Sequence, residues 1–540
     1  MQHPAYRRRL VPVLALGVVA GLAPGLVAGS ASAASGDRAA AADSAAPAAP
    51  TSARAAAGVD AERLAPYTRQ KLTWKRCAAD QPAKYQCATL KVPLDYDKPE
   101  GKRIDVAISR VKTSVPGKRR GVLTSNPGGP GGSGLDLSLM FAKGLPKNVR
   151  EQYDMIGFDP RGVGASTPLE CGLTEAEQTY PRPTRSAAEH AANTKWAKRV
   201  ADKCRAKYGS SLTHISTRNT ARDMDVMRAA LGEKKLSYFG VSYGTALGAV
   251  YMQLFPQRAD RFVLDSAVDP GRMWRGMFQV WAPEAERAYK RWTKWTAARN
   301  ATYHLGDSPA KVARTFRKLV ARADVDPIVV DGQKLDGAAV RDITRAEFFT
   351  VRSGAKTVAD LKKAAEGRQV RELPGAQEQS LDNMTSSQLA VVCSDASWPR
   401  DPETYRRDAI RDGARYPLYG DFASSITPCA YWDRGAEPAT KVDNKVKSLV
   451  VQNEWDSQTP LVTGKAMHRA LKGSRMVTVA GGEGHGVVFG GSSNACAEKA
   501  TMGYLVTGKL PAKDLTCKAT SGGQRRAETA NPAPAPFGLR

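Results

Sequence analysis

The sequence has few of the residues and spacings that bind metals or nucleotides. Only six histidines and eight cysteines occur among its 540 residues, and they form neither a C-x-x-C nor an H-E-x-x-H pattern. A zinc site built on such patterns is therefore not expected. No G-x-x-x-x-G-K-[ST] segment is present, so a phosphate-binding P-loop is also unsupported. We predict a protein without a metal or any other cofactor.

The chain also lacks a concentrated basic segment, although it is strongly basic as a whole. It has 80 Lys and Arg against 53 Asp and Glu, which gives a formal net charge of +27, and the basic residues are spread along the sequence. Proteins that bind nucleic acids usually show a basic patch or a recognisable module. We therefore predict no nucleic-acid partner. The excess charge favours solubility and weak association with an anionic cell envelope.

No long uninterrupted apolar run suggests a membrane span. The apolar stretch over 10–27 follows three consecutive arginines and is broken by Pro12, Pro24 and several glycines. Ala31-Ser32-Ala33 then provides a small-residue cleavage site. This pattern predicts a signal peptide over 1–33 and a secreted, extracellular protein with no stable membrane anchor.

The eight cysteines all follow the predicted signal peptide, and an even number in an exported chain favours disulfide bonds. The sequence does not fix their connectivity. The simplest arrangement joins neighbours along the chain, as Cys77–Cys87, Cys171–Cys204, Cys393–Cys429 and Cys496–Cys517.

The most informative segment is Gly240-Val241-Ser242-Tyr243-Gly244, a G-x-S-x-G pattern. A strand-like run over 236–239 precedes it, and a helix-like run over 245–255 follows. A nucleophile elbow needs this context, because the strand must turn sharply into a helix to present the serine hydroxyl. A Cβ at either glycine would crowd the backbone of the turn. We predict Ser242 as a catalytic nucleophile, and the alternative interpretation is a glycine-rich surface turn.

The catalytic base should be a histidine that follows the serine and the acid in the chain. His485 lies in a glycine-rich loop just after the strand-like run 477–480. We predict His485 as the base, and the alternative is a solvated loop histidine. The other histidines lie in the leader, before the serine or in helix-like segments: His3, His190, His214, His304 and His468.

The acid should lie between Ser242 and His485, at the end of a strand. The run 448–453 reads as a buried strand, and it leads into a turn that contains Asp456. A carboxylate there would accept the imidazole N–H and stabilise the imidazolium ion. We predict Asp456 as the acid. Its rivals are Glu454, Asp265 and Asp269, for the last two of which the alternative is a turn or helix cap.

The stretch Asn126–Gly134 contains five glycines and follows a strand-like run over 121–124. Such a loop can direct backbone N–H groups at a developing oxyanion. We predict the oxyanion hole from the amide of Tyr243 with that of Gly128 or Gly129. A disordered glycine linker is the other interpretation.

A neighbouring loop, 159–166, follows the strand-like run Tyr153–Phe158. We interpret it as structural: Asp159 and Arg161 would pair with each other and brace the glycine-rich loop.

Together these segments resemble the secreted bacterial tripeptidyl aminopeptidases, relatives of the proline iminopeptidases among the α/β-hydrolases. The resemblance runs from about Trp74 to Cys517 and implies Ser242 as nucleophile, Asp456 as orienting acid and His485 as base. Its segments are 128–134, 157–164, 240–244, Asp456 with Thr459-Pro460, and 484–486.

Two positions depart from the pattern of that family. Proline iminopeptidases usually carry a histidine before the Gly-Gly-Pro-Gly run, and this chain has Pro127 there, which argues against proline-specific cleavage. The acid loop is often Asp-Pro-Val-Thr-Pro, and here it is Asp456-Ser457-Gln458-Thr459-Pro460, which leaves the acid intact.

We expect an α/β-hydrolase fold, with a mostly parallel central sheet flanked by helices and an inserted helical cap. The sheet would come from 63–268 and 416–518, the second of which looks like the C-terminal segment of the tripeptidyl aminopeptidases. The intervening region 269–415 reads as helical and would form the cap over the active site. The Ala-, Ser- and Pro-rich stretch 34–62 is interpreted as a disordered linker or pro-segment, and 519–540 as a disordered tail.

The predicted function is a secreted serine exopeptidase that releases short units from the free N-termini of peptides through an acyl-enzyme. The resemblance implies units of three residues. A cap carboxylate would hold the α-amino group, and the candidates are Glu347, Asp382 and Asp395. The alternatives are a secreted carboxylesterase or lipase with the same triad, and a catalytically silent envelope-binding protein.

Overall fold

The computed structural model describes residues 62–178, 182–330, 332–368, 381–488 and 494–519. The predicted signal peptide over 1–33 lies outside these residues. The same holds for 34–61 of the predicted linker and for 520–540 of the predicted tail.

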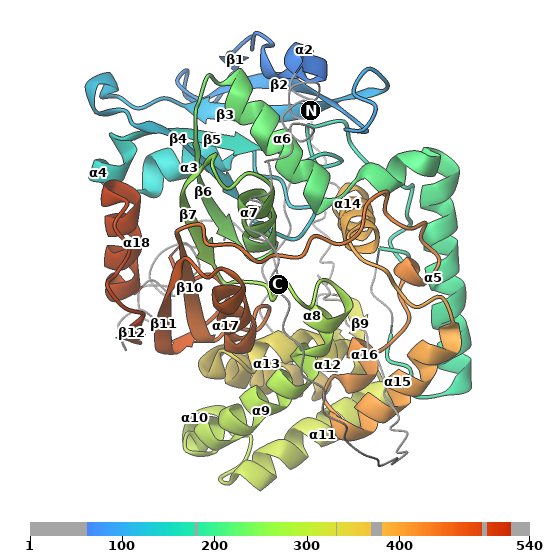
Figure 1. The fold of residues 1–540 in the computed structure, drawn as a ribbon. Helices are drawn as coiled ribbons and strands as arrows, with labels where there is room; N and C mark the ends of the chain where they lie inside the picture. The colour runs from blue at the N-terminus through green and yellow to red at the C-terminus, as the bar shows by residue number, and fades with distance from the viewer. Residues whose placement is uncertain (1–61, 179–181, 331, 369–380, 489–493, 520–540) are drawn as a thin grey trace, which may run out of the picture.

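A central sheet of ten strands organises the molecule, in the order β1-β2-β3-β5-β4-β6-β7-β10-β11-β12 (Figure 1). The pairings from β1 to β5 are antiparallel, and those from β5 to β12 are parallel. The strands are β1 (Lys75–Arg76), β2 (Gln86–Pro93), β3 (Arg103–Val111), β4 (Gly121–Asn126), β5 (Tyr153–Phe158), β6 (Leu236–Val241), β7 (Ala259–Asp265), β10 (Ser448–Trp455), β11 (Ser474–Glu483) and β12 (Leu515–Lys518). The predicted mostly parallel sheet is confirmed.

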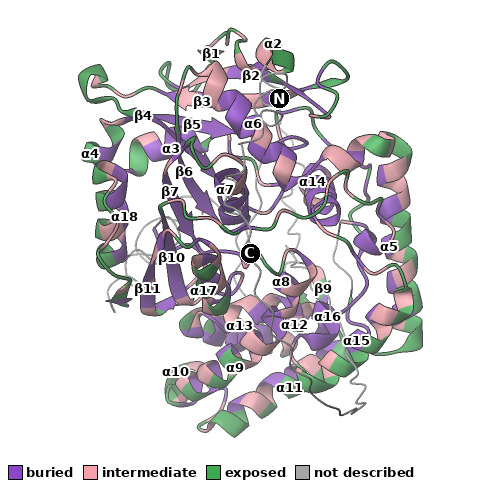
Figure 2. Cartoon of the chain, in the orientation of Figure 1, coloured by how far each residue is buried: buried purple, intermediate pink, exposed green. Residues whose placement is uncertain are grey.

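Helices cover both faces of this sheet. Successive side chains of a strand point to opposite sides, so apolar residues on both sides of a strand need helices to pack against on each face. In β6, Phe239 and Val241 join the hydrophobic cluster with α3 (Leu137–Gly144) and α18 (Ala495–Thr507), whereas Tyr238 joins the cluster with α6 (Thr217–Ala230) and α7 (Tyr243–Leu254). The central strands β4, β5 and β6 are buried along their whole length, while α5 (Ala187–Tyr208) and α11 (Pro309–Val325) expose their outer faces (Figure 2).

The helices outside the cap are α2 (Ala65–Thr68), α3 (Leu137–Gly144), α4 (Lys147–Arg150), α5 (Ala187–Tyr208), α6 (Thr217–Ala230), α7 (Tyr243–Leu254), α17 (Leu461–Ala470) and α18 (Ala495–Thr507). Short 3-10 turns cover Pro116–Lys118, Gly209–His214 and Pro428–Ala430.

A helical insertion separates β7 from β10, as expected for the cap (Figure 1). Its elements are α8 (Arg275–Gln279), α9 (Trp281–Ala297), α10 (Asn300–Tyr303), α11 (Pro309–Val325), the hairpin of β8 (Ile328–Val330) and β9 (Gln333–Leu335), α12 (Gly337–Glu347), α13 (Val351–Ala365), α14 (Leu381–Ser394), α15 (Pro402–Arg415) and α16 (Gly420–Ala423). The helices α9 and α11–α13 share a hydrophobic cluster around the fully buried Trp292. By contrast, the buried side chains of α14 join the cluster of α6 and α7. The boundaries proposed for the cap, 269–415, remain a prediction.

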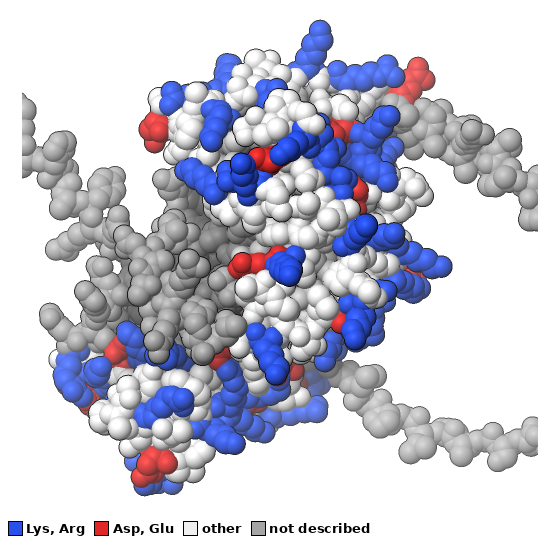
Figure 3. All heavy atoms as spheres, turned by 90° about the vertical axis from the view of Figure 1, so that its left-hand side faces the viewer, with Lys and Arg blue, Asp and Glu red and all other residues white. Residues whose placement is uncertain are grey.

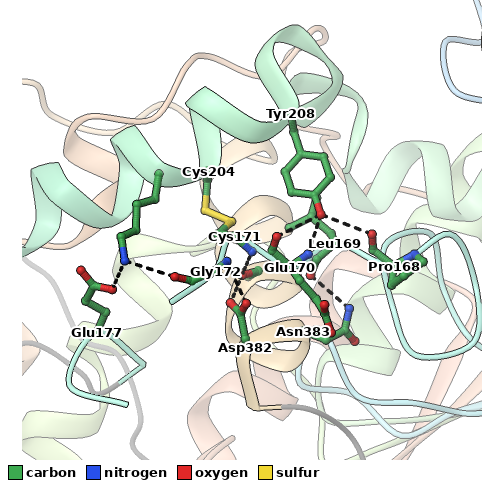
Figure 4. Close-up of a disulfide and its surroundings, with 12 residues drawn as sticks. Pro168, Leu169, Glu170, Cys171, Gly172, Glu177, Cys204, Tyr208, Asp382 and Asn383 are labelled. Carbon is green, nitrogen blue, oxygen red and sulfur yellow. Dashed lines mark hydrogen bonds and ion pairs between the residues drawn. A yellow bond between two sulfur atoms is a disulfide. The ribbon is translucent and has the colours of Figure 1, made fainter. Parts of the chain in front are cut away.

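Four disulfide bonds join the cysteines that are neighbours in sequence: Cys77–Cys87, Cys171–Cys204, Cys393–Cys429 and Cys496–Cys517. This is the simplest of the arrangements that the sequence allowed. The bond Cys171–Cys204 joins the loop before α5 to that helix (Figure 4).

The basic residues are spread over the surface. On the face drawn in Figure 3, Lys and Arg side chains are scattered among uncharged residues with few acidic ones. Within the described ranges, no helix is both long and apolar enough to cross a membrane.

Candidate active site

Ser242 occupies the turn between β6 and α7, in a backbone conformation that non-glycine residues rarely adopt. Its φ is 58° and its ψ is −127°, and only 6% of the residue is exposed. Strained backbone of this kind is typical of functional sites. A Cβ on Gly240 would lie 2.4 Å from Gly244 O, and one on Gly244 would lie 2.7 Å from Asn126 O. A side chain at either position would collide with the backbone, so both positions require glycine.

His485 and Asp456 meet at the carboxyl ends of neighbouring parallel strands. Asp456 follows β10, His485 follows β11, and β7 separates β10 from the strand that carries Ser242. The Nδ1 atom of His485 lies 2.9 Å from Asp456 Oδ1 and 3.0 Å from Oδ2. The pairing predicted from the order of these residues in the chain is thus present in the structure.

The carboxylate of Asp456 is fully buried and accepts several hydrogen bonds. The amides of Gln458 and Thr459 each donate to Oδ1 at 2.9 Å, and Thr459 Oγ1 donates to Oδ2 at 2.9 Å. Burial opposes ionisation, but the charge and hydrogen bond of His485 and these amides lower the pKa of Asp456 below its ordinary value. Asp456 is therefore an anion throughout the neutral pH range.

The other ring nitrogen of His485 is free to act as a base. Among the described residues, the buried Nε2 atom has no hydrogen-bond partner, so the Ser242 hydroxyl is not bonded to it here. Contacts of this kind often tighten only when substrate binds. Burial lowers the pKa of His485, but Asp456 and the nearby Asp265 outweigh it and raise the pKa above 6.5.

Asp265 connects the turn at Ser242 to the loop that carries His485. Its backbone carbonyl accepts from Ser242 N at 3.0 Å. Its buried carboxylate accepts from the amides of Val487 and Val488 at 2.8 and 2.9 Å, and burial raises its pKa to about 6. Asp265 thus positions the residues after His485 and does not contact the imidazole in place of Asp456.

The other two rival carboxylates have partners other than His485. Asp269 accepts from Gly271 N and pairs with Arg272. These contacts form a local turn, which was the alternative interpretation of this residue. Glu454 accepts from Gly481 N at 2.7 Å.

The glycine-rich loop lies directly against Ser242. A Cβ on Gly128 would lie 2.8 Å from Ser242 Cβ and 3.1 Å from the amide nitrogen of Tyr243, the first residue of α7. The Gly128 amide already donates to Asn126 Oδ1 at 3.0 Å. In the part of the chain that the structure describes, the Gly129 amide makes no hydrogen bond. Gly129 and Tyr243 are therefore the available pair of donors.

Asp159 braces this loop, as the sequence suggested. Its Oδ1 atom accepts from Ser133 Oγ, Gly134 N and Leu135 N at 2.6, 2.9 and 3.1 Å. The suggested pairing with Arg161 is wrong, because Arg161 is buried in an ion pair with Asp223 at 2.6 Å.

The carboxylates considered for the substrate α-amino group already have partners. Asp382 accepts from Gly172 N at 2.8 Å and Ser386 Oγ at 2.9 Å, beside the disulfide Cys171–Cys204 (Figure 4). The buried carboxylate of Asp395 accepts from Thr217 and Trp274, and burial raises its pKa to about 6. Glu347 accepts from Ser353 Oγ. None of the three is singled out by these contacts.

Three cap residues that were not predicted as site residues contact the segments next to Asp456 and His485. Arg345 and Trp281 bind the loop after Asp456. Arg291 pairs with Glu483, two residues before His485, and stacks on Trp455, just before Asp456. These pairs are separated by more than 100 residues, so no local pattern could have revealed them.

The contact between Gly128 and Ser242 yields a test of the loop. Gly128→Ala places a Cβ against Ser242, and we expect kcat to fall by about 100-fold. Gly172→Ala is the matched control, because Gly172 also has a positive φ, of 73°, but has nothing within 4 Å of the added Cβ. It should lose only about 1 kcal/mol of stability and keep its kcat. Equal kcat values for the two purified variants would contradict the proposed contact.

The sequence matches proteins of known name over most of its length. Residues 416–517 match the family model described as TAP-like protein. The chain is 38% identical to the tripeptidyl aminopeptidase of Streptomyces lividans, over 83% of this chain and 87% of that protein. It is 30% identical to the serine protease Hip1 of Mycobacterium tuberculosis, over 85% and 93% of the two chains. It is also 30% identical to carboxylesterase B of the same organism, over 84% and 91%. The resemblance found in the sequence is thus confirmed, and the chain belongs to the tripeptidyl aminopeptidase family of serine hydrolases with the α/β-hydrolase fold.

Proposed function

We propose that this protein is an exported serine exopeptidase that removes tripeptides from the free N-termini of peptides, with Ser242, Asp456 and His485 as its catalytic triad. The observation that carries the proposal is the hydrogen bond between His485 Nδ1 and the buried Asp456, which leaves Nε2 of the imidazole without a partner among the described residues. The name of the Streptomyces lividans relative supports the class of substrate. The four disulfide bonds support export to an oxidising environment.

The first half of the reaction forms an acyl-enzyme. Ser242 Oγ attacks the carbonyl carbon of the scissile bond while His485 Nε2 takes the hydroxyl proton. Asp456 holds the imidazole through Nδ1 and stabilises the imidazolium ion. The amides of Tyr243 and Gly129 donate to the oxyanion of the tetrahedral intermediate. The proton then passes from Nε2 to the leaving amine, the C–N bond breaks, and the shortened peptide departs.

The second half hydrolyses the ester. Water enters where the amine left and gives a proton to His485 Nε2 as its oxygen attacks the acyl carbon. Collapse of the second intermediate breaks the C–Oγ bond, and the proton returns to Ser242. The products are a tripeptide with a carboxylate and the unchanged enzyme.

A test of the substrate class compares three chromogenic compounds at equal concentration. These are a tripeptide anilide with a free amine, the same compound with an acetylated amine, and a simple aryl ester. We expect the free-amine anilide to be hydrolysed best and acetylation to abolish the reaction, because the α-amino group must be bound. A strong preference for the ester would favour a carboxylesterase, the function in the name of another 30%-identical relative.

The pKa of His485 predicts how activity depends on pH. The protonated imidazole cannot accept the serine proton, so kcat/KM should fall as the pH decreases through the pKa of His485 in the free enzyme. Because Asp456 and Asp265 outweigh burial and raise that pKa, the midpoint of the acid limb should lie above 6.5. A profile of kcat/KM that stays flat well below 6.5 would contradict this assignment of the base.

A further inference from the structure

Two side chains of the cap bind consecutive carbonyl groups in the loop after Asp456. Arg345, in α12, donates from Nη1 to Ser457 O at 2.9 Å and from Nη2 to Gln458 Oε1 at 3.2 Å. Trp281, in α9, donates from Nε1 to Gln458 O at 2.5 Å. The cap therefore holds the outer side of the acid loop at adjacent residues.

The N–H groups of the same peptide units face the catalytic carboxylate. Ser457 O and Gln458 N belong to one peptide plane, and Gln458 O and Thr459 N belong to the next. Both amides donate to Asp456 Oδ1 at 2.9 Å. A peptide unit is rigid and planar, with its C=O and N–H pointing in opposite directions. Fixing the oxygen of each unit therefore fixes the direction of the N–H that reaches Asp456.

The guanidinium group of Arg345 is itself held firmly. The residue is 3% exposed, and its guanidinium carbon lies 4.6 Å from the ring centroid of Trp281 and 5.1 Å from that of Tyr419. Within the described ranges its buried Nε atom has no hydrogen-bond partner. Burying a cation that has an unsatisfied donor costs free energy. The hydrogen bonds from Arg345 to the acid loop offset a substantial part of that cost. A hydrogen bond from a cation also polarises the carbonyl and strengthens the N–H at the other end of the unit.

We propose that Arg345 and Trp281 are positioning residues of the catalytic acid: they bind the carbonyls of Ser457 and Gln458 and thereby aim the next two amides at Asp456. The inference rests on the proposed triad. It assigns to the cap a role in the chemical step, in addition to covering the site. Neither side chain touches the reacting atoms.

The principal test compares Arg345→Met with Arg341→Met. Both residues lie in α12 one turn apart, but Arg341 pairs with Asp421 at 2.7 Å and has no contact with the acid loop. For Arg345→Met we expect kcat to fall by about 10- to 100-fold with KM nearly unchanged, because the acid is misdirected while the peptide still binds. Labelling of Ser242 by a small fluorophosphonate should slow by a similar factor. Arg341→Met should keep both rates, even if its melting temperature falls equally.

Two further variants keep the result interpretable if Arg345→Met folds poorly. Trp281→Phe keeps the ring and removes the donor, and it should lower kcat several-fold with KM unchanged. Arg345→Lys retains the charge and a single donor nitrogen, and it should recover part of the loss. A rise in KM with unchanged kcat and unchanged labelling would overturn the proposal, because it would make Arg345 a substrate contact. If wild-type protein is not labelled at all, the triad itself fails, which is a different outcome.

Discussion

Ser242→Ala should abolish hydrolysis of the free-amine tripeptide anilide, with a loss in kcat on the order of 10⁶-fold. The nucleophile is removed while the backbone keeps its shape, because alanine has the same Cβ as serine in a turn where φ is 58°. The residual rate would come from substrate binding and the oxyanion donors alone. Steady-state kinetics at saturating substrate, with the melting temperature measured in parallel, provide the test.

The matched control is Ser237→Ala, at the opposite end of the same strand. Ser237 is also buried in β6, where its Oγ atom makes a long hydrogen bond of 3.3 Å to Asp260. This variant should keep the wild-type kcat and the labelling by fluorophosphonate, whereas Ser242→Ala should lose both. A Ser242→Ala protein that still hydrolyses the anilide at a tenth of the wild-type rate would remove Ser242 from the mechanism. An unlabelled wild type would instead favour the silent envelope-binding protein.

The parts of the site that were predictable from sequence are those with a local signal. The turn at Ser242 needs two glycines and a change from strand to helix, and all of these lie within one short segment. Asp456 and His485 each follow a buried strand, and parallel neighbouring strands bring their carboxyl ends to the same edge. The order of the segments along the chain was therefore enough to predict that the imidazole and the carboxylate meet.

What the sequence could not provide depends on contacts between distant segments. Asp159 and Arg161 are close in the chain and opposite in charge, yet Arg161 pairs with the remote Asp223. The same reason hides Arg345 and Trp281, whose partners in the acid loop are more than 100 residues away. The choice between Gly128 and Gly129 as an oxyanion donor was also open, because it depends on where the side chain of Asn126 points.

Asp456→Asn should lower kcat by about 10⁴-fold while leaving the fold intact. The side-chain amide of asparagine would donate to His485 Nδ1, and the ring proton would then reside on Nε2. An imidazole in that tautomer cannot accept the hydroxyl proton of Ser242. The replacement also removes the charge that raises the pKa of His485, so the acid limb of the residual activity should move to lower pH.

Glu454→Gln is the control that separates Asp456 from Glu454, the other acidic residue near the end of β10. The half-buried Glu454 accepts from Gly481 N and makes no hydrogen bond to the imidazole, so its replacement should leave kcat within about twofold. The comparison has a clear opposite outcome: if Glu454→Gln is inactive and Asp456→Asn is not, the orienting acid is Glu454. Because Asp456 is fully buried and accepts from two amides, a hydroxyl and the imidazole, we expect the large loss at Asp456 alone.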